Sequence, residues 1–125
     1  MNQHARLLNM DNSHFQNATG LPGENHYASA HDLAVLAQAI INRFPEHYGI
    51  YSEKYFTYNK IRQPNRNKLL WRDKTVDGLK TGFTNAAGYC LVASAKRDGM
   101  RLISVVMGAK DENARAQESQ KLLAY

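Results

Sequence analysis

The sequence has 125 residues, a length that suits one domain with its own hydrophobic core and is short for two. Apolar residues make up 43% of the chain and charged residues 22%, ordinary values for a globular protein that exclude general disorder. The net charge of +5 favours an acidic partner, such as a nucleic acid, an anionic membrane surface or a ligand that carries a carboxylate.

The first residues, MNQHARLLNM, predict a helix, because Met1, Ala5 and Leu8 share one helical face. No capping residue precedes this pattern, and the last residues, QKLLAY, also stop on an apolar helical pattern. We therefore expect the chain to be a piece of a larger protein. Residues 11–27 are rich in Asn, Gly, His and Pro and predict an irregular surface loop.

The strongest helical pattern begins at Ser29, a predicted N-cap with Asp32 three residues later, and ends at Pro45. Residues 48–58 contain partly alternating aromatic side chains, which predict short extended structure. The segment from Lys60 to Lys74 is basic and predicts a loop with one helical turn. Its basic residues are Lys60, Arg62, Arg66, Lys68, Arg72 and Lys74.

Three strand candidates follow in quick succession, over residues 76–84, 88–96 and 101–108. Asp98-Gly99, between the second and the third, is a strong signal for a tight hairpin turn. Residues 111–125 predict a closing helix with two acidic residues in its first turn. The order predicts an α+β fold, in which helices pack on an antiparallel sheet built as a three-strand meander.

The sequence gives little support for a zinc site, a serine-hydrolase site or a nucleic-acid-binding patch. No two histidines have the helical spacing of a zinc motif, Cys90 is the only cysteine, and no Gly-x-Ser-x-Gly sequence is present. The basic run from Lys60 to Lys74, with Trp71 inside it, matches a nucleic-acid patch in composition. No recognised nucleic-acid-binding motif accompanies it, so a solvated loop is the preferred interpretation.

Lys80-Thr81-Gly82 lies in the first predicted strand, where glycine weakens a sheet and an inward lysine is costly to bury. Gly82 would let a ligand backbone approach the strand, Thr81 offers a hydroxyl, and Lys80 offers a positive charge. The three residues suit a peptide held as an added strand with its C-terminal carboxylate bound. The alternative is an edge strand whose outward lysine discourages aggregation.

At these residues the sequence resembles the low-molecular-mass penicillin-binding proteins, in particular the serine-type D-alanyl-D-alanine carboxypeptidases. The segments that carry the resemblance are FQNATGLPGENHYASAHDLAVLAQAII, YSEKYFTYN, NRNKLLW and VDGLKTGFTNAAGYCLVASAKRDGMRLISVVMGA. They follow the family's order over nearly the whole chain. VDGLKTG, when it occurs together with the other segments, is highly specific for this family. The resemblance implies part of a β-lactamase/transpeptidase-like fold.

Two of the three family motifs are absent from the chain. The family's enzymes use Ser-x-x-Lys for the nucleophile and its base, Ser-x-Asn for a second serine, and Lys-Thr-Gly for the opposite wall. No serine here is followed by lysine three residues later or by asparagine two residues later. We therefore expect residues 1–125 to be the C-terminal portion of the catalytic domain and to be inactive alone.

The resemblance also implies roles for five residues. Lys80 would lie across from the absent serines, tune their protonation and help to hold the substrate. Thr81 would bind the terminal carboxylate, and Gly82 would let the D-alanyl-D-alanine backbone lie along the strand. The backbone N–H of Phe83 would complete an oxyanion hole. Arg115 matches a family arginine that assists carboxylate binding. Relatives often have threonine or histidine in place of Phe83, so a polar side-chain contact is lost here.

The implied parent protein is a periplasmic carboxypeptidase, attached to the outer face of the inner membrane. It would remove the terminal D-alanine from peptidoglycan pentapeptide through an acyl-enzyme. Its partners would be stem peptides ending in D-Ala-D-Ala, β-lactams and the missing N-terminal part of the domain, with no nucleic acid, metal or organic cofactor. Two alternatives stay open: a basic nucleic-acid-binding module that uses Lys60 to Lys74, and a non-catalytic remnant that binds muropeptide ends.

Overall fold

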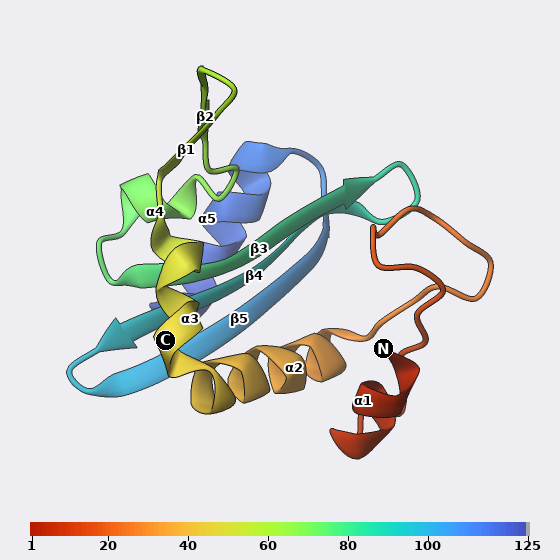
Figure 1. Cartoon of the computed structure of the whole chain (residues 1–125). Helices are drawn as coiled ribbons and strands as arrows, with labels where there is room; N and C mark the ends of the chain where they lie inside the picture. Colours follow the sequence, from red (N-terminus) through yellow and green to blue (C-terminus); the bar gives the residue numbers. More distant parts are fainter. Residues whose placement is uncertain (125) are drawn as a thin grey trace.

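A three-stranded antiparallel sheet forms the centre of the computed structural model, which describes residues 1–124 (Figure 1). Its strands β3 (Val76–Thr84), β4 (Gly88–Arg97) and β5 (Met100–Ala109) lie in the order β3–β4–β5. Asp98 and Gly99 make the turn between β4 and β5 with positive φ angles of 50° and 78°, as a tight hairpin requires. The predicted α+β class and the meander are confirmed.

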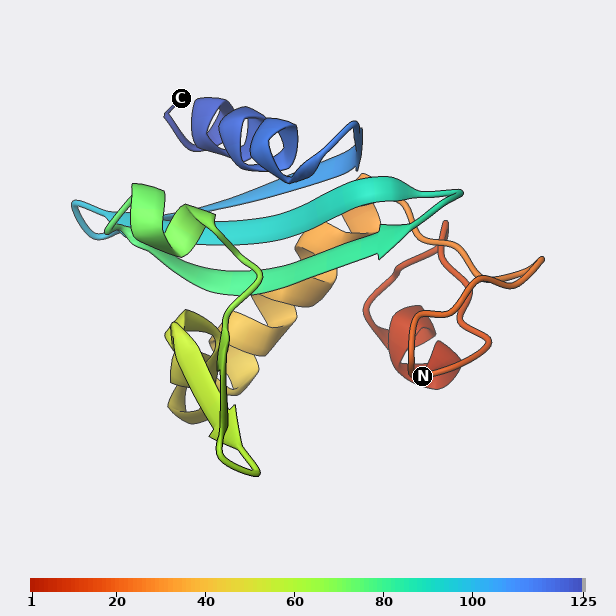
Figure 2. The same cartoon turned by 90° about the horizontal axis from the view of Figure 1, so that it is seen from above.

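Two helices cover opposite faces of this sheet (Figure 2). Helix α2 (Ala30–Arg43) crosses one face and contacts β4 and β5, whereas α5 (Glu112–Leu123) packs on the other face. Both helices are predicted by the sequence, although the last residue predicted for the closing helix, Tyr125, lies outside the described residues. None of the helices within residues 1–124 combines the length and the apolar character that a membrane span requires.

The hydrophobic core lies on the α5 side of the sheet. Alternate residues of β4, namely Leu91, Ala93 and Ala95, point to this side and are almost fully buried. Helix α4 (Leu69–Arg72), the start of β3 and the end of α5 complete the cluster with Leu69, Leu70, Val76 and Leu123. This side of the sheet is therefore closely packed.

The opposite side, between the sheet and α2, is packed less completely. An apolar cavity of about 330 Å³ lies there, lined by aliphatic side chains of α2 and of the strands. Leu33, Leu36 and Ile40 form the apolar stripe of α2, yet all three are only half-buried. The two faces of the sheet thus differ in how tightly their covering helices pack.

The N-terminal segment is held on α2 by a buried carboxylate. This N-terminal segment consists of α1 (Asn2–Leu7) and the predicted irregular loop. Asp32 is 2% exposed and accepts hydrogen bonds from the backbone N–H of Asn12 at 2.8 Å and from the Ser13 hydroxyl at 2.7 Å. The bond from Ser13, above all, lowers the pKa of Asp32 below its usual value. The backbone N–H of Asp32 in turn donates to the Ser29 cap at 3.1 Å.

The prediction of extended structure over residues 48–58 is wrong in its first half. Pro45 opens a short helix, α3 (Pro45–Tyr48), and a 3-10 turn, η1 (Gly49–Ser52), follows it. Proline at the first helical position loses no hydrogen bond. Pro45, which ends the helical pattern of α2 in the sequence, can therefore begin α3. The second half is extended as predicted, in β1 (Tyr55–Tyr58).

The predicted loop over residues 60–74 contains a second short strand. β2 (Ile61–Pro64) pairs with β1 in a hairpin that projects from the body of the molecule (Figure 1). The turn residues Asn59 and Lys60 both have positive φ, a conformation that lysine rarely adopts. Asn59 suits this conformation but Lys60 does not, so the turn carries a weaker sequence signal than Asp98-Gly99. The helical turn expected in this segment is confirmed as α4.

Candidate ligand-binding site

The Lys80-Thr81-Gly82 triplet lies in β3, an edge strand of the sheet. It pairs with residues 90–92 of β4, and no other strand within residues 1–124 pairs with the free side of β3. An edge strand offers unpaired backbone groups to an extended ligand. The position of the triplet therefore allows a peptide to add to the sheet.

An open cavity of about 870 Å³ borders this part of β3. All five residues that the sequence predicts for the site line it: Lys80, Thr81, Gly82 and Phe83 from β3, and Arg115 from α5. The fold thus brings together residues from separate elements of the chain. Their roles toward a ligand stay predictions.

Arg115 is a buried cation that borders the cavity. The residue is 5% exposed, and no carboxylate within residues 1–124 forms a salt bridge with it. Its guanidinium lies 5.4 Å from the centre of the Tyr89 ring, a cation–π contact that orients the side chain. A buried charge without a counter-charge is costly, so Arg115 is suited to binding an anion from outside the chain.

Lys80 and Thr81 add a second cation and a hydroxyl to the same cavity. The Lys80 side chain is exposed, and its Nζ donates to the backbone carbonyl of Thr81 at 2.6 Å. An ammonium group has three donors, so this bond leaves two for a ligand. A carboxylate in the cavity would therefore meet two cations that approach from different elements.

Two glycines of β3, Gly78 and Gly82, differ in the space that the protein leaves for a side chain. A Cβ atom on Gly78 would lie 2.3 Å from the hydroxyl oxygen of Tyr48, so the packing of the protein excludes a side chain there. A Cβ atom on Gly82 would have no protein atom within 4 Å. Protein packing therefore does not demand glycine at position 82, whereas a ligand lying against the strand would.

Phe83 gives one end of the cavity an aromatic surface. Its side chain is 53% exposed, and its ring centre lies 4.3 Å from that of Tyr89 at an interplanar angle of 30°. Tyr89 thus contacts both Phe83 and Arg115. One tyrosine ring connects the apolar end of the cavity with the cation that borders it.

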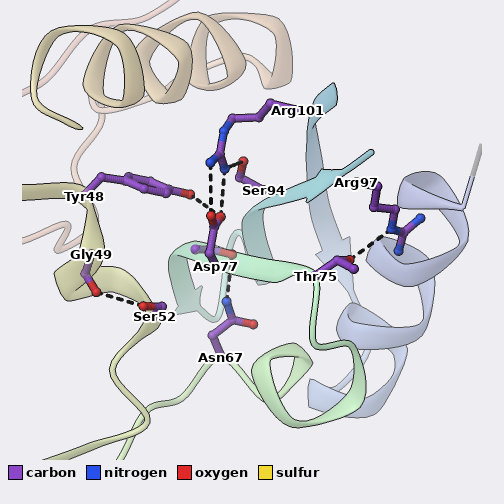
Figure 3. A network of polar contacts seen from close by, with 10 residues as sticks. Tyr48, Gly49, Ser52, Asn67, Thr75, Asp77, Ser94, Arg97 and Arg101 are labelled. Carbon is purple, nitrogen blue, oxygen red and sulfur yellow. Dashed lines mark hydrogen bonds and ion pairs between the residues drawn. The ribbon is translucent and has the colours of Figure 1, made fainter. Parts of the chain in front are cut away.

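A polar network holds the first half of β3 (Figure 3). Asp77 accepts two hydrogen bonds from Arg101, at 2.8 and 3.1 Å, and one from the Tyr48 hydroxyl at 3.0 Å. Arg101 also donates to Ser94 Oγ at 2.9 Å. The hydrogen bond to Asp77 raises the pKa of Arg101, and burial raises the pKa of Tyr48 to about 12. Both donors therefore keep their protons at neutral pH.

Asn67 supports the same stretch of strand from the other side. Its buried amide donates to the carbonyl of Gly78 at 3.1 Å and accepts from the backbone N–H of Leu69 at 3.2 Å. This contact and the network at Asp77 fix β3 directly before Lys80. Sequence reasoning missed this support, because the partners of Asp77 are 24 and 29 residues away in the chain.

Sequence reasoning also missed two parts of the cavity wall. Arg66 lines the cavity, although the sequence placed it in a basic loop. The turn of residues 17–20 lines it as well, and there Asn17 Oδ1 accepts from the backbone N–H of Gly20 at 2.7 Å. The basic run is thus divided among different structures: Arg62 lies in β2, Arg66 at the cavity and Arg72 in α4. No group of three potential metal ligands lies together within residues 1–124.

Known proteins similar to this chain agree on one family. A family model described as D-alanyl-D-alanine carboxypeptidase matches residues 1–111. D-alanyl-D-alanine carboxypeptidase DacC of Escherichia coli is 52% identical in an alignment 126 positions long, which covers 100% of this chain and 32% of that protein. The chain spans about a third of the length of such curated relatives.

Solved structures give the same result for the fold. Penicillin binding protein 5 from Haemophilus influenzae superposes with a TM-score of 0.94 at 52% identity, covering 98% of this chain and 36% of that one. Penicillin-binding protein D2 from Listeria monocytogenes, in an ampicillin-bound form, superposes with a TM-score of 0.91 at 35% identity. That match covers 98% of this chain and 52% of the Listeria protein. The predicted resemblance and fold class are both confirmed.

Proposed function

Because the chain belongs to the D-alanyl-D-alanine carboxypeptidase family, we propose that it forms one wall of a site for peptides that end in D-alanyl-D-alanine. The observation that carries the proposal is Arg115, which is buried at the cavity of Lys80 and Thr81 and forms no salt bridge with any carboxylate of residues 1–124. The peptide carboxylate would receive charge-assisted hydrogen bonds from this wall, which are stronger than bonds between neutral groups.

The peptide backbone would lie along the free edge of β3. Gly82 provides the space for this approach, since a side chain there would occupy the region that the ligand needs. The backbone N–H of Phe83 would serve as one donor of an oxyanion hole. Such a donor is worth on the order of 3 kcal/mol of transition-state stabilisation.

The parent protein, in this proposal, is a serine carboxypeptidase that acts on peptidoglycan pentapeptide and is acylated by β-lactams. A serine from outside this chain would attack the carbonyl between the two D-alanines, and the terminal D-alanine would leave after taking up a proton. Water would then hydrolyse the acyl-enzyme. Because the chain contains no Ser-x-x-Lys sequence, it would need the N-terminal part of the domain for this chemistry.

The proposed substrate also indicates where the parent protein acts. Peptidoglycan lies outside the inner membrane, so we place the enzyme in the periplasm, attached to the outer face of that membrane. Fractionation of cells that produce the parent protein tests this location. Recovery of the protein with the cytoplasm would contradict it.

Titration with an N-acylated D-alanyl-D-alanine peptide tests the binding site directly. The chain should bind the peptide, and Lys80→Ala should bind it more weakly because one of the two cations is lost. A matched peptide with an amidated C-terminus serves as the control, since it presents no carboxylate. Equal binding of both peptides would contradict the proposed site.

Labelling with a fluorescent penicillin tests the division of the catalytic machinery. The isolated chain should give no covalent band, and an added N-terminal part of the domain should restore the band if the two pieces associate. A covalent band on the isolated chain would contradict the proposal. Peptide binding without any restored label would favour the non-catalytic remnant.

A further inference from the structure

A second open cavity lies between α4 and the beginning of α5. Its volume is about 630 Å³, and it shares Tyr89 and Glu112 with the wall of the peptide cavity. A ligand bound there would therefore lie next to the peptide. The other polar and aromatic residues that line it are Lys68, Trp71, Arg72, Asp111 and Asn113.

Two aromatic residues, Trp71 and Tyr89, line this cavity, and Trp71 is the only tryptophan in the sequence. Trp71 is 40% exposed, although the two residues before it, Leu69 and Leu70, are buried in the core. Its ring lies 5.9 Å from that of Tyr55 in an edge contact, and the Lys54 ammonium lies 5.7 Å from the ring centre. These contacts hold the indole in place, so it offers an ordered apolar surface to a ligand.

The charges around Trp71 are balanced. Two cations, Lys68 and Arg72, line the cavity together with two carboxylates, Asp111 and Glu112. Phosphate groups or a polyanion would meet carboxylates as well as cations, so these ligands are disfavoured. Donors and acceptors around one aromatic surface suit a neutral ligand that has many hydroxyl or amide groups and one apolar face.

A pyranose ring of an amino sugar has these properties, because its hydroxyl and acetamido groups lie around a ring whose C–H bonds form an apolar face. The Arg72 side chain already reaches across the cavity, where Nη2 donates to Asn113 Oδ1 at 3.3 Å. This contact links α4 to α5, the two helices that border the cavity. We propose that the cavity at Trp71 binds an N-acetylated sugar ring of a peptidoglycan glycan strand.

This subsite rests on the proposed function, since it would hold the glycan part of a substrate whose peptide part occupies the cavity of Lys80. Nothing in the chemistry at Trp71 requires the peptide carboxylate, however. The two parts can therefore be tested with separate ligands.

The experiment uses the full chain and a tetrasaccharide of N-acetylglucosamine, which carries no peptide and no charge. Trp71 fluorescence should change on titration, and calorimetry should give the affinity. Trp71→Ala should weaken sugar binding by about tenfold, the size expected for losing one aromatic contact. Phe56→Ala, which removes another exposed aromatic residue, from the projecting hairpin, should leave sugar affinity unchanged.

A second variant guards against a folding defect in Trp71→Ala. Asn113 is exposed in the first turn of α5, and Asn113→Ala should weaken sugar binding several-fold with an unchanged circular dichroism spectrum. Sugar affinity that stays unchanged in both variants would overturn the proposal. Failure of the wild-type chain to bind the tetrasaccharide, or tighter salt-dependent binding of an oligonucleotide at Trp71, would overturn it too.

The D-alanyl-D-alanine peptide separates this proposal from the proposed function. Trp71→Ala should keep the peptide affinity, whereas Lys80→Ala should keep the sugar affinity and lose peptide affinity. A wild-type chain that binds the sugar but not the peptide would count against the proposed function. A wild-type chain that binds the peptide but not the sugar would count against the sugar subsite.

Discussion

Arg115 and Tyr89 are joined by a cation–π contact of 5.4 Å that spans two elements of the fold, α5 and β4. Phe83 of β3 stacks on the same tyrosine ring at 4.3 Å. The position of Tyr89 therefore sets how the arginine of the helix meets the edge strand. The cation and the strand that would bind a peptide are held by one residue of the central strand.

Replacing Arg115 by methionine should separate binding from stability. The affinity for a D-alanyl-D-alanine peptide should fall by roughly 10- to 100-fold, because charge-assisted hydrogen bonds are lost. The free energy of unfolding should stay constant or rise, since an apolar side chain replaces a buried charge that has no salt-bridge partner in the described part of the chain. Calorimetric titration and urea denaturation measure the two quantities. Arg43→Met, at the exposed end of α2, is the control, and lower stability with unchanged affinity would make Arg115 a structural residue.

The two glycines of β3 should respond in opposite ways to alanine. Gly78→Ala should lower the free energy of unfolding by about 1–3 kcal/mol, because the new methyl group overlaps the Tyr48 hydroxyl. Gly82→Ala should change stability by less than about 0.5 kcal/mol and should weaken peptide binding. Urea denaturation and peptide titration check both. Tyr48→Phe should partly restore stability to the Gly78→Ala variant, and no such restoration would exclude the overlap as the cause.

Alkaline pH should weaken the support of β3. The pKa of Tyr48 is about 12 in the folded protein, against an ordinary value of 10.0, so the folded state favours the protonated hydroxyl. Its contribution to stability is complete below pH 10 and is lost as the pH rises through about 12. Unfolding free energies measured across this range should fall more steeply for the wild type than for Tyr48→Phe. Tyr58→Phe, at an exposed position, should keep the wild-type slope.

Replacing Asp32 by asparagine should loosen the N-terminal loop on α2. The lowered pKa of Asp32 means that its carboxylate stabilises the fold above its ordinary pKa, and that this contribution is lost as the pH falls through the lower folded value. Asp32→Asn should therefore be less stable at pH 7 and should lose less stability in acid. Amide hydrogen exchange should become faster in residues 12–20, which include the turn at the cavity. The exposed Asp11→Asn is the control, and unchanged exchange in Asp32→Asn would contradict the expected anchoring.

The sequence predicts the central sheet because its signals are local. The strands are nine or ten residues long, and the Asp98-Gly99 turn between β4 and β5 uses a dipeptide that favours a tight hairpin. Lys80-Thr81-Gly82 is likewise a local motif, whereas Phe83 and Arg115 were expected from the family resemblance, and all five residues line one cavity. Where neighbouring residues determine the structure, sequence reasoning is sufficient.

Long-range contacts are the part that sequence reasoning missed. Nothing near Asp77 in the chain indicates that Tyr48 and Arg101 bind its carboxylate. The hairpin of β1 and β2 was missed for a different reason, since its turn places Lys60 at a positive φ against the preference of lysine. Arg66 lies in a loop between β2 and α4, as the sequence predicts, but a charge pattern does not show which cavity a cation borders.

The unequal packing of the two faces of the sheet has a mechanical consequence. The side covered by α5 is closely packed, so a shift of one side chain there is transmitted to its neighbours. The apolar cavity of about 330 Å³ on the α2 side leaves room for side chains to move instead. Lys80, Thr81 and Gly82 line this cavity as well as the peptide cavity, so they lie at the boundary between the two.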